Sequence, residues 1–197
     1  TERISANWKR LVKSSDTVIL PGDFSWGLKL EETKKDFEFL ENLPGKKILL
    51  KGNHDLWWST SKKLREFLDN NKFNSVDFIF NNCAVCEGYA VAGTRGWFFD
   101  DKPDPKILQR EAGRLELSLS AAEKTGLPVL TFLHYPCVWG DEVCEEIFGV
   151  IKRHGINQVY HGHIHGAGAC KVKTEYGGVK FRLLSCDCVD FTPVFIA

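Results

Sequence analysis

Methionine, a net charge and a long apolar run are all missing from this sequence of 197 residues. Lys and Arg together number 26, as do Asp and Glu, so the chain carries no overall field that would attract a polyanion. Nucleic acid is therefore not expected as the main partner, although a local basic patch is compatible with these counts. No apolar run is long enough to cross a bilayer and no signal peptide heads the sequence, so we expect a cytoplasmic protein without a membrane partner.

Repeats, low-complexity tracts and interdomain linkers are also missing, and hydrophobic residues make up 43% of the chain. These features predict one globular domain over residues 1–197 and leave its oligomeric state open. The absence of methionine even at the first position indicates that the sequence begins inside a longer protein.

The seven cysteines are an odd number in a chain too long to need disulfides, which favours reduced thiols. A zinc site at Cys83-x-x-Cys86 is an alternative for two of them. A structural zinc requires a second pair of ligands, and Cys186-x-Cys188 matches that requirement poorly. We therefore favour free thiols at Cys83 and Cys86 and assign them no role.

The stretch at residues 46–55, KKILLKGNHD, has an unusual concentration of site chemistry. An apolar run short enough for one buried strand ends at a glycine, and Asn53, His54 and Asp55 follow directly. The glycine permits a tight turn, which would present an amide oxygen, an imidazole and a carboxylate at a strand end.

The same arrangement recurs at three other places. One β-branched or leucine-rich run precedes Gly22-Asp23, another precedes His134, and a third precedes GHIHG at residues 162–166. Segments with helical periodicity separate the runs, so we expect parallel strands whose carboxyl ends open onto one sheet edge, where ligand sites of α/β sheets lie. The side chains predicted to converge there as metal ligands are those of Asp23, Asn53, His134, His163 and His165.

Oxygen and imidazole ligands without a thiolate are typical of a hydrolytic divalent metal site rather than a structural zinc. Manganese, iron, zinc and nickel all accept such ligands, so the sequence does not decide the metal. Hydrolysis of a phosphate ester needs a nucleophile at neutral pH, neutralised phosphoryl charge and a stabilised leaving oxygen. Two divalent ions can supply most of these needs.

The ordered set Gly-Asp, Gly-Asn-His-Asp, a lone His and Gly-His-x-His resembles the calcineurin-like metallophosphoesterase superfamily, matched from Gly22 to Gly166. The resemblance implies an α/β fold, a four-layer α/β/β/α sandwich of two mixed β-sheets flanked by helices. It also implies a metal-dependent hydrolase of small phosphorylated substrates, either a phosphomonoesterase or a phosphodiesterase, that uses two metal ions and a hydroxide bridging them.

The roles of the metal ligands follow from the same resemblance. Asp23 would bridge the two ions, and Asn53, His134 and His163 would complete one of them. His165 would belong to the other ion, together with an Asp-x-His pair that opens the family pattern. No Asp-x-His occurs anywhere in this chain. We expect the strand that carries it to be missing from the given sequence; a family member that has lost half of one metal site is the other account.

Four further residues are candidates for the site. His54 resembles the family's catalytic histidine, which donates a proton to the leaving oxygen, and Asp55 would orient the loop or that imidazole. Arg95 follows a predicted strand between glycines, so its guanidinium is predicted to bind substrate phosphate, with a structural arginine as an equal alternative. His161 is either a support for the metal ligands or a structural histidine.

Periodicity also predicts the elements between these motifs. Helices are expected over residues 2–13, 30–43, 59–70, 107–125 and 141–154. Short strands of the second sheet are expected at residues 76–80, 83–87 and 89–93, and a hairpin around Gly177 should join residues 169–176 to 178–184.

Three loops are predicted to rim the site, at residues 24–28, 57–58 and 97–105, and their chemistry favours a substrate with an aromatic moiety. Packing beneath the metal loop is the preferred interpretation of Trp57 and Trp58, and a wall that grips an aromatic leaving group is the alternative. A solvated connector is the commoner explanation for residues 100–105.

Two other functions fit the same fold. A non-catalytic scaffold would bind partner proteins, but it has no use for a leaving-group acid at His54. A nuclease of the superfamily would be expected to carry a basic groove or an added DNA-binding segment, and neither is visible in the sequence. Hydrolysis of small phosphate esters is therefore the main hypothesis.

Overall fold

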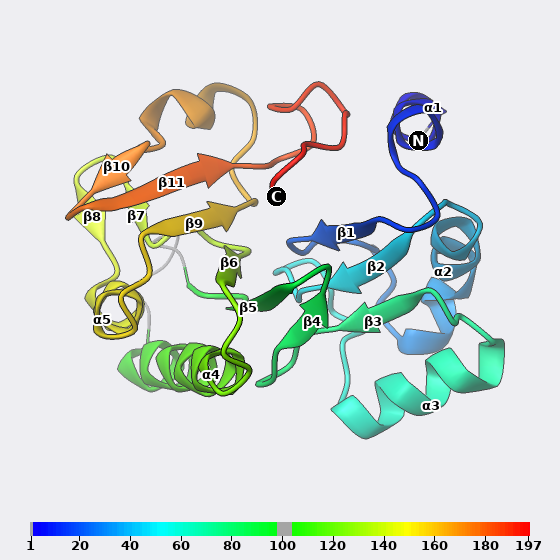
Figure 1. Ribbon diagram of the computed structural model, residues 1–197, viewed down its shortest axis with the longest axis horizontal. Helices are drawn as coiled ribbons and strands as arrows, with labels where there is room; N and C mark the ends of the chain where they lie inside the picture. Colours follow the sequence, from blue (N-terminus) through cyan, green and yellow to red (C-terminus); the bar gives the residue numbers. More distant parts are fainter. Residues whose placement is uncertain (1, 98–103) are drawn as a thin grey trace.

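The computed structural model describes residues 2–97 and 104–197. Two β-sheets lie face to face, and helices cover the outer face of each, so four layers follow one another across the molecule (Figure 1). This arrangement is the four-layer α/β/β/α sandwich that the family resemblance implied.

The first sheet is parallel throughout and has the order β1-β2-β3. Its strands are β1 (Thr17–Leu20), β2 (Lys46–Leu49) and β3 (Val76–Phe78). The helical layer outside it consists of α1 (Glu2–Leu11), the 3-10 turn η1 (Leu30–Thr33), α2 (Lys34–Glu41) and α3 (Ser61–Asn71). The helices predicted in this half are confirmed to within a few residues, except that the second one begins as a 3-10 turn.

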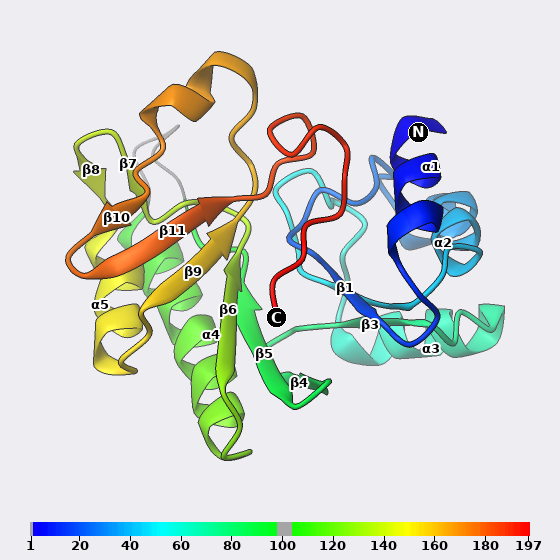
Figure 2. The ribbon, with the colours of Figure 1, turned by 45° about the horizontal axis from the view of Figure 1, so that its top comes forward.

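The second sheet has the order β10-β11-β9-β6-β5-β4 and is parallel except at its two antiparallel edge strands. Its strands are β4 (Ala84–Cys86), β5 (Tyr89–Thr94), β6 (Val129–Leu133), β9 (Gln158–His161), β10 (Glu175–Tyr176) and β11 (Val179–Leu183). Figure 2 shows its strands β5, β6 and β9 running side by side, with the first sheet beside them.

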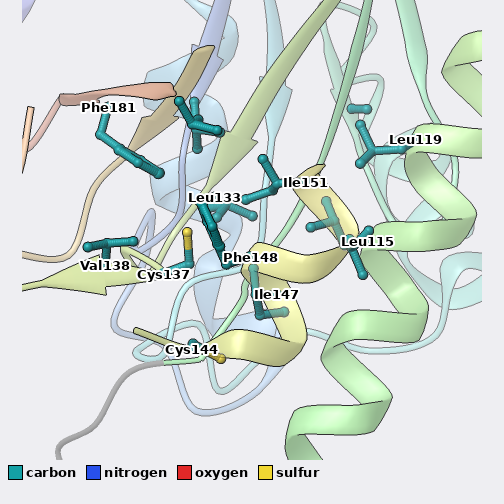
Figure 3. Close-up of a cluster of buried hydrophobic side chains, with 14 of the residues drawn as sticks. Leu115, Leu119, Leu133, Cys137, Val138, Cys144, Ile147, Phe148, Ile151 and Phe181 are labelled. Carbon is teal, nitrogen blue, oxygen red and sulfur yellow. The ribbon is translucent and has the colours of Figure 1, made fainter. Parts of the chain in front are cut away.

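Two helices cover the outer face of this sheet, α4 (Pro105–Glu123) and α5 (Glu145–Arg153). Leu115 and Leu119 of α4 meet Ile147 and Ile151 of α5 above Leu133 of β6 (Figure 3). All five side chains are fully buried, and burying each contributes roughly 1.5–3 kcal/mol relative to leaving it in water. This cluster holds the strand that leads to His134 in place.

A separate core cluster lies between the two sheets. Ile48 and Leu50 from the first sheet pack with Val91, Phe132 and Tyr160 from the second. The rings of Phe132 and Tyr160 stack with their centroids 5.0 Å apart. Because this cluster joins the faces of the two sheets, the carboxyl ends of β1 and β2 lie next to those of β6 and β9.

The expectation of a single sheet edge is therefore wrong in one respect. The four strands that precede the motifs belong to two different sheets, and their ends meet across the layer between them. The prediction that residues 76–80 belong to the second sheet is also wrong, because β3 pairs with β2 in the first sheet through Leu49 and Phe78. A period-two pattern describes which side of a strand is buried and carries no information about its partner strand.

Two element boundaries also differ from the prediction. The helix expected over residues 141–154 begins only at Glu145, because β7 (Val138–Trp139) and β8 (Glu142–Val143) form a short hairpin before it, with Gly140 at a positive φ of 58°. The strand expected over residues 169–176 is reduced to β10, because the small residues after His165 form the 3-10 turn η2 (Gly166–Lys171). The hairpin at Gly177 is confirmed.

Among the described residues, no helix combines the length and the apolar character that crossing a bilayer requires.

Candidate metal centre

Two glycines allow the loops after β1 and β2 to touch. Gly22 has a φ of 103°, and a Cβ on it would lie 2.7 Å from Cα of Gly52. A Cβ on Gly52 would lie 2.1 Å from Oδ1 of Asp23. No larger residue fits at either position without separating the loops, so the glycines place Asp23 directly beside the Gly-Asn-His-Asp turn.

Asp55 holds these two loops together from the inside. Its side chain is fully buried, and its oxygens accept the backbone N–H groups of Asp23 (2.8 Å), Phe24 (2.9 Å), Ser25 (3.1 Å) and Gly52 (2.7 Å). Burial raises the pKa of Asp55, while the bonds from Gly52 and Ser25 act in the opposite direction. These contacts match the loop-orienting role predicted for Asp55, and its direct part in catalysis stays a prediction.

Four of the predicted ligands come together above this clamp. Oδ1 of Asn53 lies 2.6 Å from Nε2 of His134 and 3.0 Å from Nδ1 of His163. Nε2 of His134 lies 3.5 Å from Oδ2 of Asp23. The ligand atoms of Asp23, His134 and His163 all lie within 4.8 Å of one another, a spacing that a single metal ion can bridge.

The hydrogen bonding of His134 shows that this cluster suits a cation. Nδ1 of His134 lies 2.9 Å from the carbonyl oxygen of Pro21, which can only accept, so Nδ1 carries the proton. Burial lowers the pKa of His134 to about 4, with Asp23 acting in the opposite direction, so the ring is neutral at pH 7. The lone pair of Nε2 then faces the amide oxygen of Asn53 and the carboxylate of Asp23. Oxygen and nitrogen atoms that point at one another with no proton between them can all give their lone pairs to one metal ion.

Two residues of the cluster have unusual backbone conformations. Asp23 and His163 both have positive φ values, 58° and 66°, which cost free energy for residues with a Cβ. Such strain persists only where surrounding contacts hold it. Here the Tyr135 ring packs at 4.4 Å from the ring of His163 and 5.0 Å from that of His134. Apart from its place directly after His134, no sequence signal pointed to Tyr135.

His54 stands apart from the ligand cluster. Its backbone N–H donates to Oδ1 of Asp23 at 2.9 Å, and its imidazole stacks on the indole of Trp26 with centroids 4.1 Å apart. Trp26 is 74% exposed, so the stacked pair lies at the surface of the site. Neither imidazole nitrogen of His54 has a hydrogen-bond partner among the residues that the structure describes, which leaves the ring available to exchange a proton with a substrate.

The guanidinium of Arg95 pairs with another residue of this chain. Its Nη2 lies 3.3 Å from Oε1 of Glu111, which is fully buried, and its guanidinium lies over the ring of Trp97 at 5.0 Å. The ion pair with Glu111 thus agrees with the interpretation of Arg95 as a structural arginine. Its binding to substrate phosphate stays a prediction.

A model of the calcineurin-like phosphoesterase family matches residues 2–167 of the chain, a span that contains every ligand of this cluster. The chain belongs to the calcineurin-like phosphoesterase family. Members of this family are metal-dependent and generally hydrolyse phosphoesters, and the Asp and His cluster described above is consistent with that chemistry.

One solved structure, that of the protein TT1561 of Thermus thermophilus, is similar to this calcineurin-like chain with a TM-score of 0.56 and 16% identity. The match covers 85% of this chain and 76% of that one, and at this identity it supports the fold alone. A second solved structure is 14% identical, covers 77% of this chain and 62% of its own, and has a TM-score of 0.47, too low to support an argument. No curated protein matches the chain.

The last predicted ligand of the calcineurin-like pattern, His165, does not join the cluster. Its Nδ1 lies 2.7 Å from Oδ1 of Asp187, and the backbone N–H of Gly166 donates to Oδ2 of the same carboxylate at 2.8 Å. Cys186 lies with them, so that three ligand atoms are again within 4.8 Å of one another. Asp187 lies in the C-terminal tail, 22 positions after His165, and no motif in the sequence pairs the two.

The remaining site predictions concern packing and loops. Trp57 is 3% exposed and donates its Nε1–H to Ser25 and Asp55, and Trp58 packs edge-on against Phe78, so the packing interpretation of both indoles is confirmed. His161 is fully buried, which lowers its pKa to about 4, and this environment favours a structural role. Residues 98–103, most of the predicted rim loop, lie outside the described residues.

The cysteines are free thiols among the described residues. Burial raises the pKa of Cys86, which makes its thiolate a poor metal ligand at pH 7.

Proposed function

We propose that this protein is a metal-dependent hydrolase of phosphate esters that acts on small substrates, as a phosphomonoesterase or phosphodiesterase with two divalent ions. The observation that carries the proposal is the convergence of Asp23, Asn53, His134 and His163 from four strand ends in two sheets, with the unprotonated Nε2 of His134 facing the oxygens of Asn53 and Asp23. A purely structural contact would pair a donor with an acceptor, whereas a bound cation needs lone pairs that point at it from several sides.

The chain's own residues would hold the ions as follows. Asn53, His134 and His163 would bind one ion, and Asp23 would be shared between the two. His165 is the candidate for the second ion and would have to exchange its bond with Asp187 for it. The chain contains no Asp-x-His to complete the ligands of that ion. When bound, the ions supply an acidified water as nucleophile and neutralise the charge of the phosphoryl oxygens.

The other residues position the substrate and move a proton. His54, on the stacked face beside Trp26, donates a proton to the leaving oxygen as it departs. The backbone bond from His54 to Asp23 ties this donor to the metal cluster, and the clamp by Asp55 fixes the geometry of both loops. The exposed indole of Trp26 offers an apolar surface next to the leaving group, which supports a substrate with an aromatic moiety.

The test is metal analysis of the whole natural protein combined with hydrolysis assays. p-Nitrophenyl phosphate and its bis ester would be assayed with added manganese, so that the two ester classes are compared directly. About two metal equivalents per chain with turnover would support the proposal and identify the ester class. One equivalent or none, with no turnover after metal addition, would favour the scaffold function instead.

A further inference from the structure

A small basic recess lies at the carboxyl ends of β2, β3 and β5, next to the metal centre. Lys51, Phe80, Arg95, Glu111 and Arg114 form its main walls. The recess is partly open to solvent. All of the lining residues belong to the described part of the chain.

The charges in this basic recess do not balance. Glu111 is its one carboxylate, is fully buried, and accepts from Arg95 (3.3 Å), Arg114 (2.7 Å) and the hydroxyl of Thr94 (3.1 Å). Both of its oxygens are therefore used. Three cations, those of Lys51, Arg95 and Arg114, face this single carboxylate, which leaves an excess of two positive charges in a partly buried space.

Two of the cationic donors have no acceptor. Nε of Arg95 is buried and has no hydrogen-bond partner among the described residues. The ammonium of Lys51 likewise forms no hydrogen bond or ion pair within the described chain. Asp55 also attracts the ammonium of Lys51, but its oxygens already accept bonds from the loops. An unpaired buried donor such as Nε of Arg95 is costly unless a ligand satisfies it, and the solvent-accessible ammonium of Lys51 is free to bind the same ligand.

The guanidinium groups are held in place by aromatic rings. Arg95 lies over Trp97 at 5.0 Å, and Arg114 lies over Phe80 at 5.5 Å. Stacking fixes the plane of a guanidinium and so reduces the conformational entropy that binding would cost. The basic recess is thus arranged to accept an oxyanion, for which planar arginine donors and a lysine are the usual partners.

The basic recess shares its loops with the metal centre. Lys51 is two residues before Asn53 in the turn after β2. On the other sheet, the N–H of His134 donates to the carbonyl of Thr94 at 3.3 Å, and the N–H of Tyr135 donates to that of Arg95 at 2.9 Å. The loops that carry Lys51 and Arg95 are therefore neighbours of the loops that carry the metal ligands Asn53 and His134.

We propose that the basic recess binds an oxyanion, phosphate or carboxylate, that is a second acidic group of the substrate. The substrate class is then a phosphate ester that carries a further acidic group away from the scissile bond. The assignment to substrate rests on the proposed function, whereas the binding of an oxyanion by Lys51, Arg95 and Arg114 does not.

The binding part is tested on metal-free protein with inorganic sulfate as the probe. Thermal unfolding of the wild type is measured in sodium sulfate and in sodium chloride at equal ionic strength. Sulfate should raise the midpoint, and Lys51→Met should weaken the apparent sulfate affinity by about 10-fold or more, as expected when one charged hydrogen bond is lost. Lys51→Arg, which keeps the charge, should retain the response.

The matched control is Lys62→Met, which removes the same charge from an 85% exposed side chain on α3. Its sulfate response should equal that of the wild type. An equal response in Lys51→Met and the wild type would overturn the basic recess as an anion site, whatever the protein hydrolyses. A response that depends on Lys51 in a protein that hydrolyses no ester would support the basic recess and contradict the proposed function alone.

The substrate part is tested with metal-loaded whole protein. The kcat/KM values for 3-carboxyphenyl and 4-carboxyphenyl phosphate are compared with that for phenyl phosphate. At least one carboxylated ester should be preferred, and Lys51→Met should reduce that preference about 10-fold. Equal values for the three esters in the wild type would overturn the assignment to substrate, and the oxyanion of the basic recess would then be a free anion.

Discussion

Asn53 and His134 lie 81 positions apart in the chain, yet Oδ1 of Asn53 is 2.6 Å from Nε2 of His134. The other ring nitrogen of His134 is committed to the carbonyl of Pro21, so these two atoms face each other as acceptors. The contact joins the end of β2 in one sheet to the end of β6 in the other. A cation between the two sheets would therefore both bind here and hold the layers together.

Asp23→Asn should remove metal from the protein. The substitution keeps the shape of the side chain and the acceptor for the His54 N–H, but it removes the negative charge shared by the proposed ions. Metal content by mass spectrometry should fall for both ions. Asp141→Asn, at a fully exposed carboxylate, is the control and should leave the content unchanged. Normal occupancy in Asp23→Asn would exclude it as the bridge.

His54→Ala should separate catalysis from metal binding. The imidazole contacts Trp26 and no ligand of the cluster, so metal content should stay near that of the wild type. Turnover should fall about 100-fold, the usual scale for loss of a general acid. His154→Ala, which removes a histidine paired with Glu116 and Glu123, should leave turnover unchanged. A parallel loss of metal in His54→Ala would contradict the role of His54 as proton donor.

Asp55→Asn should lower stability and metal affinity together. Each oxygen of Asp55 accepts at least two backbone N–H groups. In the variant an NH₂ group replaces one of these oxygens and cannot accept them, which should lower the free energy of unfolding by roughly 3 kcal/mol. Urea unfolding and metal titration would measure the two effects. A variant with wild-type stability and metal affinity but reduced turnover would instead show that Asp55 takes part in the chemistry.

Gly52→Ala should disrupt the site more than its size suggests. The added methyl would lie 2.1 Å from Oδ1 of Asp23 and 2.2 Å from its backbone nitrogen, so the two loops must separate. Metal affinity should fall by at least 10-fold, with stability lowered by about 2 kcal/mol or more. Gly113→Ala, in the open middle of α4, should instead raise stability by about 0.5–1 kcal/mol. Equal effects of the two substitutions would refute the close contact.

The metal-free protein should lose stability as the pH falls from 7 to 5. Burial lowers the pKa of His161 to about 4 from an ordinary 6.5, so the unfolded chain takes up a proton in this range and the folded chain does not. The contribution is fully present above pH 6.5 and is lost as the pH falls toward 4, about 2 kcal/mol by pH 5.

His161→Gln isolates this contribution. Urea unfolding at pH 7 and pH 5 should show a loss about 2 kcal/mol smaller in the variant than in the wild type. The other titrating groups are common to both proteins and cancel in the comparison. An identical pH dependence would mean that His161 is protonated equally in the folded and unfolded chains.

Local sequence patterns were enough to predict many of the residues of the site. Glycine followed by Asp23, or by Asn53 and His54, after a short apolar run is a local signal, because a strand end and a tight turn depend on neighbouring residues. The order of the motifs was enough to predict the family and the four-layer fold, which the family match and the layers confirm.

The partners of the predicted residues were not visible in the same way. Arg95 and His165 both follow strand ends in glycine-rich motifs, yet one binds Glu111 on α4 and the other binds Asp187 in the tail. Each partner lies far along the chain, and its position depends on how helices and tail pack over the sheet. Sequence spacing carries no information about that packing.

The chemical groups that the site can contain were readable from the motifs, because each motif folds from its own residues. Which of these groups meet depends on the tertiary structure. It divided the motif strands between two sheets, turned Asp55 inward as a clamp, and set Lys51, Arg95 and Arg114 around one carboxylate. These outcomes depend on packing between segments that are distant in the chain, and the core between the two sheets determines that packing.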